Sequence, residues 1–265
     1  MTTNGCTEVT ARSYFIGYQT IVIKEITRIM RIWAQTLIPP AITMSLYFVI
    51  FGQLIGRRIG EMGGMDYMQF IVPGLIMLSV ITNSYGNITS SFFGAKFGRH
   101  IEELLISPLP PILILAGYVT GAVFRALTVG ALVLVVASFF SEIRIHSWPV
   151  TISIVLLTSV VFALAGFINA TLARKFDDIS IIPTFVLQPL TYLGGVFFSV
   201  DLLPGVWQQL ALVNPILYMV NAFRYGMLGV SDVSLVSAFA IIIIFMLALA
   251  AVCLTLLKRG TGLRT

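Results

Sequence analysis

The chain has 265 residues, of which 58% are hydrophobic and 10% are charged, and its mean hydropathy is +0.98. Its formal net charge is +5, from 16 lysines and arginines against 11 acidic residues. Soluble domains carry roughly 25% charged residues, so this composition excludes a water-soluble globular protein and is typical of a polytopic membrane protein.

The first predicted element is an amphipathic helix over residues 12–33. Apolar residues such as Val22 and Ile26 recur there at helical spacing, and Lys24 and Arg28 belong to a basic stripe. A helix of this kind lies in the membrane interface, with its basic residues toward the lipid headgroups. We therefore expect an interfacial helix ahead of the first crossing.

Six apolar runs of roughly 20 residues follow, and each is long enough to cross a hydrocarbon core of about 30 Å as a helix. They cover residues 36–55, 68–93, 112–140, 148–172, 179–200 and 234–257. The predicted fold class is therefore an all-α polytopic membrane protein with six transmembrane helices. An even number of crossings places both termini on the same side.

The positive charges indicate which side this is. With both termini in the cytoplasm, eleven lysines and arginines lie inside and four, Arg57, Arg58, Arg144 and Arg224, lie outside. The net charge then reflects orientation and attraction to anionic lipid, and it does not indicate a nucleic-acid partner.

The second run carries a polar stripe, and the fifth run carries another, each at spacings of three or four residues. The stripes are Asn83, Asn87 and Ser91 in the second run, and Thr184, Gln188 and Thr191 in the fifth. Polar stripes in lipid must face protein or water. Hydrogen bonding between packed helices is the simpler interpretation, and the lining of a substrate path is the alternative.

A cytoplasmic loop over residues 94–111 separates the second and third runs. It predicts a short amphipathic helix that ends at the prolines. Phe97, Ile101, Leu104, Leu105 and Pro108 fall on one face of that helix, and Arg99, Glu102 and Glu103 fall elsewhere. Docking into the groove of a partner and lying on lipid headgroups explain this pattern equally well.

Arg125 stands near the middle of the third run, where an isolated arginine costs about 2.5–3.5 kcal/mol. No acidic residue of the six runs can neutralise it. Its partners are then backbone carbonyls, water, lipid phosphate or an anionic substrate. Anchoring between helices is the favoured interpretation, and contact with substrate in a translocation path is the alternative.

Residues 201–230 are apolar, but Pro204, Asn214, Pro215 and Arg224 divide them into pieces too short to cross. A seventh crossing would also send the basic C-terminal residues outside. We therefore expect a re-entrant segment on the outer side, with short helices at about 204–213 and 215–227. Such backbone must be covered by protein or water.

The chain lacks the residues that several kinds of chemistry require. The acidic residues and both histidines all lie outside the six runs, which disfavours a proton-coupled pump and an intramembrane metalloenzyme. Cys6 and Cys253 form no disulfide framework or metal motif. No phosphate-binding loop occurs, so any ATP must be bound by another polypeptide.

Taken together, these features resemble the membrane permease subunit of ABC-2 type exporters. The resemblance covers nearly the whole chain, and its most specific parts lie in the cytoplasmic loop and the outer segment. They read Ile101-Glu102-Glu103-Leu104-Leu105-Ile106-Ser107-Pro108, Leu203-Pro204-Gly205-Val206-Trp207 and Asn214-Pro215-Ile216-Leu217-Tyr218.

The resemblance implies one transmembrane domain over residues 1–265 and a homodimer in a bacterial inner membrane. It implies a separate ABC ATPase subunit in two copies, which binds ATP and Mg while this chain binds no cofactor and is not an enzyme. The helix in the 94–111 loop would then be the coupling helix, and the second and fifth crossings would line the path. The resemblance does not identify the cargo.

Three other functions remain open from the residues alone. An ion-coupled secondary transporter is disfavoured by the missing intramembrane acids. A membrane-embedded enzyme acting on lipid would need a nucleophile with a base beside it, and His100 and His146 lie in loops on opposite sides of the membrane. A scaffold without transport has little reason to keep costly polar groups in lipid.

Overall fold

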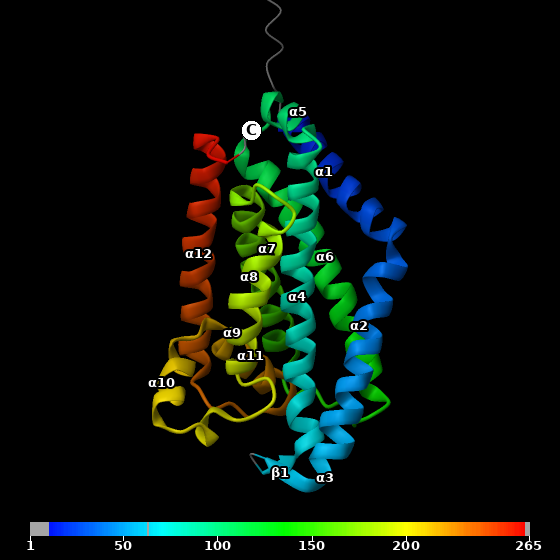
Figure 1. Cartoon of the computed structure of the whole chain (residues 1–265), viewed down its shortest axis with the longest axis vertical. Helices are drawn as coiled ribbons and strands as arrows, with labels where there is room; N and C mark the ends of the chain where they lie inside the picture. Colours follow the sequence, from blue (N-terminus) through cyan, green and yellow to red (C-terminus); the bar gives the residue numbers. More distant parts are fainter. Residues whose placement is uncertain (1–10, 63, 263–265) are drawn as a thin grey trace, which may run out of the picture.

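The structure, a computed structural model, describes residues 11–62 and 64–262 and is a long bundle of helices (Figure 1). The last turn of α12 (Leu235–Arg259) and α5 (His100–Ile106) lie at one end of the bundle. The opposite end carries α3 (Gly56–Ile59), β1 (Glu61–Met62) and α10 (Gly205–Val213).

Helices dominate the described chain. The remaining elements are α1 (Ala11–Arg31), α2 (Trp33–Tyr47), the π-helix η1 (Phe48–Ile55), β2 (Met65–Asp66), α4 (Tyr67–Phe97), α6 (Pro111–Ser138), α7 (Trp148–Leu172), α8 (Asp178–Ile182), the π-helix η2 (Pro183–Leu187), α9 (Gln188–Leu193), the 3₁₀ turn η3 (Val200–Leu202) and α11 (Pro215–Leu228). The two strands pair antiparallel, with Glu61 opposite Asp66, in a small hairpin that the sequence did not predict.

Five helical runs in the described residues are long and apolar enough to cross a membrane, by length and composition. They are Trp33–Ile59, Tyr67–Phe97, Pro111–Ser138, Trp148–Leu172 and Leu235–Arg259, and each overlaps nearly all of a predicted crossing. The predicted crossing at 179–200 is less regular, because α8, η2 and α9 contribute five, five and six residues and helix ends at Leu193. At 1.5 Å per residue these segments reach about 24 Å, which is consistent with a sixth crossing.

Helix α4 is the centre of the bundle. It packs against α6, α7 and α11, and nearly all of its side chains are buried. Its exposed positions share one narrow face and, apart from its last residue, are small: Thr82, Gly86, Ser90 and Gly94, followed by Phe97. One edge of the central helix is therefore left uncovered by the part of the chain that the structure describes.

Helix α1 packs closely along α6, through a notch made by two glycines. A Cβ atom at Gly117 would lie 2.6 Å from Ile21, and one at Gly121 would lie 2.5 Å from Glu25. The absence of side chains at these positions lets the two helices approach. Glu25 lies outside the six predicted crossings, as expected, but its side chain is fully buried against the bundle.

The outer segment forms two short helices, as predicted, and α11 packs against α7, α12 and α4. Arg224, which the charge count places on the outer side, is fully buried within this segment. Its guanidinium donates to the Gly195 carbonyl at 2.6 Å and to Asn221 Oδ1 at 3.1 Å, and it lies 3.9 Å from the centre of the Phe70 ring. These contacts tie α11 to α4 and to the turn after α9.

Candidate functional site

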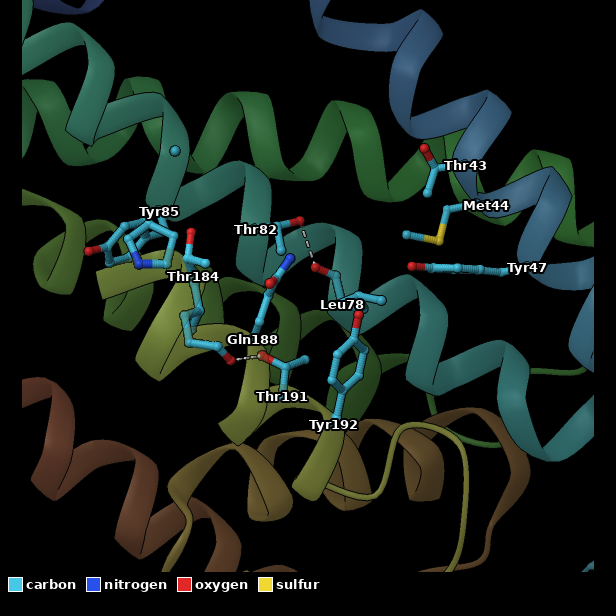
Figure 2. A pocket seen from close by; sticks show the side chains of 13 residues that line it. Thr43, Met44, Tyr47, Leu78, Thr82, Tyr85, Thr184, Gln188, Thr191 and Tyr192 are labelled. Atoms are coloured by element: carbon cyan, nitrogen blue, oxygen red, sulfur yellow. Dashed lines mark hydrogen bonds between the residues drawn. The ribbon is translucent and has the colours of Figure 1, made fainter. Parts of the chain in front are cut away.

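A groove of about 270 Å³ lies between α2, α4 and the broken helix that runs from α8 through η2 to α9 (Figure 2). None of the described residues that line it is charged. Its lining is made of hydroxyl, amide, aromatic and aliphatic groups: Thr43, Met44, Tyr47, Leu78, Thr82, Tyr85, Gly86, Pro183, Thr184, Leu187, Gln188, Thr191 and Tyr192. Such a surface can contact an uncharged or amphiphilic molecule, with hydroxyl and amide groups for hydrogen bonds and aromatic faces for stacking.

The polar stripe of the fifth predicted crossing lines this groove, with Thr184, Gln188 and Thr191 all on its wall. Figure 2 shows the Gln188 side chain extending toward Thr82 of α4. Thr82 and Thr191 each donate their hydroxyl proton to the carbonyl four residues earlier, at 2.8 and 2.6 Å. Their oxygen atoms can therefore still accept hydrogen bonds from a molecule in the groove.

The polar stripe of the second crossing faces a different direction. Asn83 accepts a hydrogen bond from Arg125 Nε at 3.3 Å, Asn87 accepts one from Arg28 at 2.7 Å, and Ser91 donates one to Glu25 at 2.6 Å. Asn87 and Ser91 are buried under α1 and do not line the groove. Successive residues of a helix point about 100° apart, so the wall of the groove is made instead by Thr82, Tyr85 and Gly86.

Arg125 also lies away from the groove. It is half-buried on α6, and its hydrogen bond to Asn83 links α6 to α4. Among the described residues no carboxylate lies within ion-pair distance of Arg125. The structure therefore supports its interpretation as a link between helices, and it leaves the positive charge without an anionic partner.

The helix of the loop between the second and third runs is α5, and it projects at the same end of the bundle as the last turn of α12 (Figure 1). Ile101 is 1% exposed and belongs to the core, and Leu104 is half-buried, so these residues anchor α5. Glu102, Glu103 and Leu105 are exposed, and so is Ile106, at 84%. The predicted apolar face is therefore divided, because Ile101 and Leu104 hold the helix while Phe97, Leu105 and Pro108 are accessible.

The turn into α5 is sharp. Arg99 is exposed and has a φ of 61°, the only positive φ of a non-glycine residue in the described chain. Phe97 is exposed at the end of α4, but the centre of its ring lies 4.8 Å from that of Phe176, on the loop after α7.

In the loop after α7, the backbone N–H groups of Arg174 and Lys175 donate to Asp178 and hold the pKa of its carboxyl group below the ordinary value.

Sequence reasoning missed the α2 and α4 walls of the groove and the exposed apolar residue of α5. The four-residue spacing of Thr82, Gly86, Ser90 and Gly94 was a signal for the open edge of α4, since small residues repeated at this spacing mark one helix face. No local pattern distinguishes Ile106 from its apolar neighbours. Its exposure depends on the turn at Arg99, which sets the rotation of α5.

Comparison with known proteins places the chain in a family. The model of the family described as "ABC-2 type transporter" matches residues 17–228, which is most of the chain. This match includes α4, α5, the groove and α11.

Individual relatives agree with this match. The chain is 57% identical over 252 residues to the inner membrane transport permease YadH of Escherichia coli strain K12, covering 95% of this chain and 98% of YadH. It is 25% identical over 215 residues to nodulation protein J of Rhizobium leguminosarum bv. viciae, covering 81% and 83%. The multi-pass helical chain with its uncharged groove therefore belongs to the ABC-2 type transporter family, as a non-catalytic transport permease subunit.

Proposed function

We propose that this chain is the permease subunit of an ATP-driven exporter in a bacterial inner membrane. Two copies form the translocation path, and two copies of a separate ABC ATPase bind ATP and Mg and supply the energy. Both termini and α5 lie in the cytoplasm. The chain belongs to a transport family, and its sequence contains no phosphate-binding loop. Both findings favour a permease subunit that is separate from the ATPase subunit.

One observation carries the proposal: α4 runs without interruption from the groove to α5. The helix lines the groove from Leu78 to Gly86, continues to Phe97, and is followed after two residues by α5. Ile101 anchors α5 in the core that α4 and α6 share. A movement imposed on the exposed face of α5 would therefore be transmitted along a rigid element to the wall of the groove.

The open edge of α4 supports the dimer. Thr82, Gly86, Ser90 and Gly94 are exposed on an otherwise buried helix, and the broken helix opposite exposes large apolar side chains such as Ile181 and Phe185. A second copy facing this side would close the groove into an enclosed path. The path residues are then Thr184, Gln188 and Thr191 with Thr82 and Tyr85. Asn83, which bonds Arg125, does not line the groove.

The test of this function is a double substitution in α5. Glu102→Gln together with Glu103→Gln removes two exposed charges without changing the shape of the helix, so insertion and folding should persist. If α5 docks on the ATPase through these charges, the double variant should retain about ten-fold less ATPase in a pull-down, or should uncouple hydrolysis from transport.

Glu142→Gln is the matched control, because Glu142 is exposed at the other end of the bundle and pairs only with Arg144. Unchanged ATPase binding and unchanged coupling in the double variant would remove α5 from the mechanism. Transport that survives without any ATPase but stops when the proton gradient is collapsed would favour an ion-coupled carrier instead.

A further inference from the structure

Two arginines meet the same face of α4 one helical turn apart. Arg28 of α1 donates to Asn87 Oδ1 at 2.7 Å, and Arg125 of α6 donates to Asn83 Oδ1 at 3.3 Å. A turn of helix rises about 5.4 Å, so the two guanidinium groups lie close enough to repel one another. Two unrelated parts of the chain thus bring positive charge to one place.

The local charges do not balance. Glu25 is the one carboxylate of this group, and it is shared by Arg28 at 3.2 Å and by the Ser91 hydroxyl at 2.6 Å. Within the described part of the chain Arg125 has no carboxylate partner, and Arg28 Nε and Asn87 Nδ2 make no hydrogen bond. The cluster therefore carries more positive charge than the protein neutralises.

The cluster is accessible at the surface of the chain. The Arg28 side chain is 28% exposed and Arg125 is also partly exposed. Large apolar side chains of α1 and the start of α2 are exposed as well, namely Ile23, Met30 and Trp33. Exposed apolar side chains of this segment are suited to acyl chains, while partly exposed arginines are suited to a headgroup.

We propose that Arg28 and Arg125 together bind the phosphate of an anionic phospholipid from the leaflet in which α1 lies. Arginine matches the geometry of phosphate oxygens, and partly buried arginines bind phosphate more strongly than exposed ones. The lipid phosphate supplies the anion that the protein lacks, and its acyl chains lie along α1 and the start of α2. This site is separate from the groove and does not depend on the proposed transport cycle.

Trp33 is a natural reporter for this site, five residues after Arg28 and 57% exposed. In the full-length protein, Trp148→Phe and Trp207→Phe remove the other two tryptophans, which are exposed near the opposite end. The purified protein in detergent is titrated with brominated phosphatidylglycerol, and in parallel with brominated diacylglycerol, which has no phosphate. Bromine quenches Trp33 fluorescence when the lipid binds beside it.

Brominated phosphatidylglycerol should quench Trp33 fluorescence at a markedly lower mole fraction than brominated diacylglycerol does. Each arginine should contribute about five-fold to this ratio of mole fractions. Arg28→Gln and Arg125→Gln should each reduce this preference, and Arg125→Lys should retain most of it because the charge remains. Arg31→Gln is the control, since Arg31 is exposed on the same helix outside the cluster.

Equal quenching by the two lipids would overturn the proposal. An Arg125→Lys variant as impaired as Arg125→Gln would also overturn it, because the arginine would then act only through its hydrogen bond to Asn83. A third arm adds inorganic phosphate to protein already quenched by brominated phosphatidylglycerol. Retained quenching supports a lipid site, whereas full recovery of the fluorescence would show that the site takes free phosphate.

Discussion

Glu25 is a buried carboxylate in a helix whose sequence suggests a surface element. Its two oxygen atoms are held by Ser91 and Arg28, and its Cβ fits over Gly121. A charge in such a position is stable only while its partners are in place. The residue therefore fixes α1 to α4 and α6, and it does not face solvent.

Glu25→Ala should destabilise the folded protein by about 3 kcal/mol, because it leaves Arg28 with no carboxylate partner. Denaturation of the purified protein in mixed micelles, followed by circular dichroism, measures this loss. Glu102→Ala, at an exposed position of α5, is the control and should change stability by less than about 0.5 kcal/mol. Equal stability of both variants would contradict the assigned role of Glu25.

The same residues show which of these contacts could be predicted from the sequence. Arg125 and the stripe of Asn83, Asn87 and Ser91 were recognised as polar groups that need partners, and hydrogen bonding between helices was the favoured interpretation. The partners of Asn87 and Ser91 could not be named, because Glu25 and Arg28 belong to a different element more than 50 residues away. Burial of these charges depends on the tertiary contact between α1 and α4.

At the scale of elements, α5 combines an anchored side with an accessible side. Ile101 is buried in the core and Ile106 is exposed, although the two residues are only five positions apart in the same short helix. The anchored side should determine the stability of the protein, and the accessible side should determine its association with the ATPase.

Ile101→Ala should reduce stability by about 2–4 kcal/mol, because it leaves a cavity in the core. Ile106→Ser should change stability by less than about 0.5 kcal/mol but weaken binding of the ATPase subunit. Thermal unfolding and a quantitative pull-down on the same two preparations separate these effects. An Ile106→Ser protein that binds the ATPase as tightly as the unchanged protein would contradict a docking role for this face.

The contact between α1 and α6 depends on the glycine notch. Gly121→Val should force α1 away from α6, because even a Cβ atom there would lie 2.5 Å from Glu25. Hydrogen exchange across residues 18–31 should then become faster. Gly205→Ala is the control, since a Cβ at Gly205 would meet no atom within 4 Å. Unchanged exchange in the Gly121→Val variant would mean that α1 is held by other contacts.

The boundaries of the long helices were predictable because apolar runs bounded by polar and proline residues leave little freedom in a membrane protein. The run at 148–172 matches α7 at both ends, and the pair of outer helices begins and ends within one residue of its predicted limits. The fifth crossing was less predictable. Pro183 and Pro189 interrupt its hydrogen bonding, and the helix ends at Leu193 before the Gly194-Gly195 turn.

At the scale of the whole molecule, the open edge of α4 predicts how two copies face one another. A spin label at Ser90→Cys lies on this edge, and one at Ile244→Cys lies on an exposed part of α12 that has no contact with the groove. In each case Cys6 and Cys253 are replaced by serine. Pulsed electron resonance should give a shorter distance between copies for position 90 than for position 244.

A longer distance at position 90 than at position 244 would place the interface elsewhere. If no distance between copies can be detected and the protein elutes as a monomer, the dimer itself is contradicted. In that case the groove between α4 and α9 would have to serve a single chain.

The central claim is that this permease is driven by a separate ATPase. The most direct measurement is to purify the tagged chain in mild detergent from its native host, identify what copurifies by mass spectrometry, and assay ATP hydrolysis in the eluate. If a separate ATPase drives the permease, an ABC ATPase subunit should copurify in equal amount, with hydrolysis that vanadate inhibits. A chain that elutes alone, without hydrolysis, would contradict it.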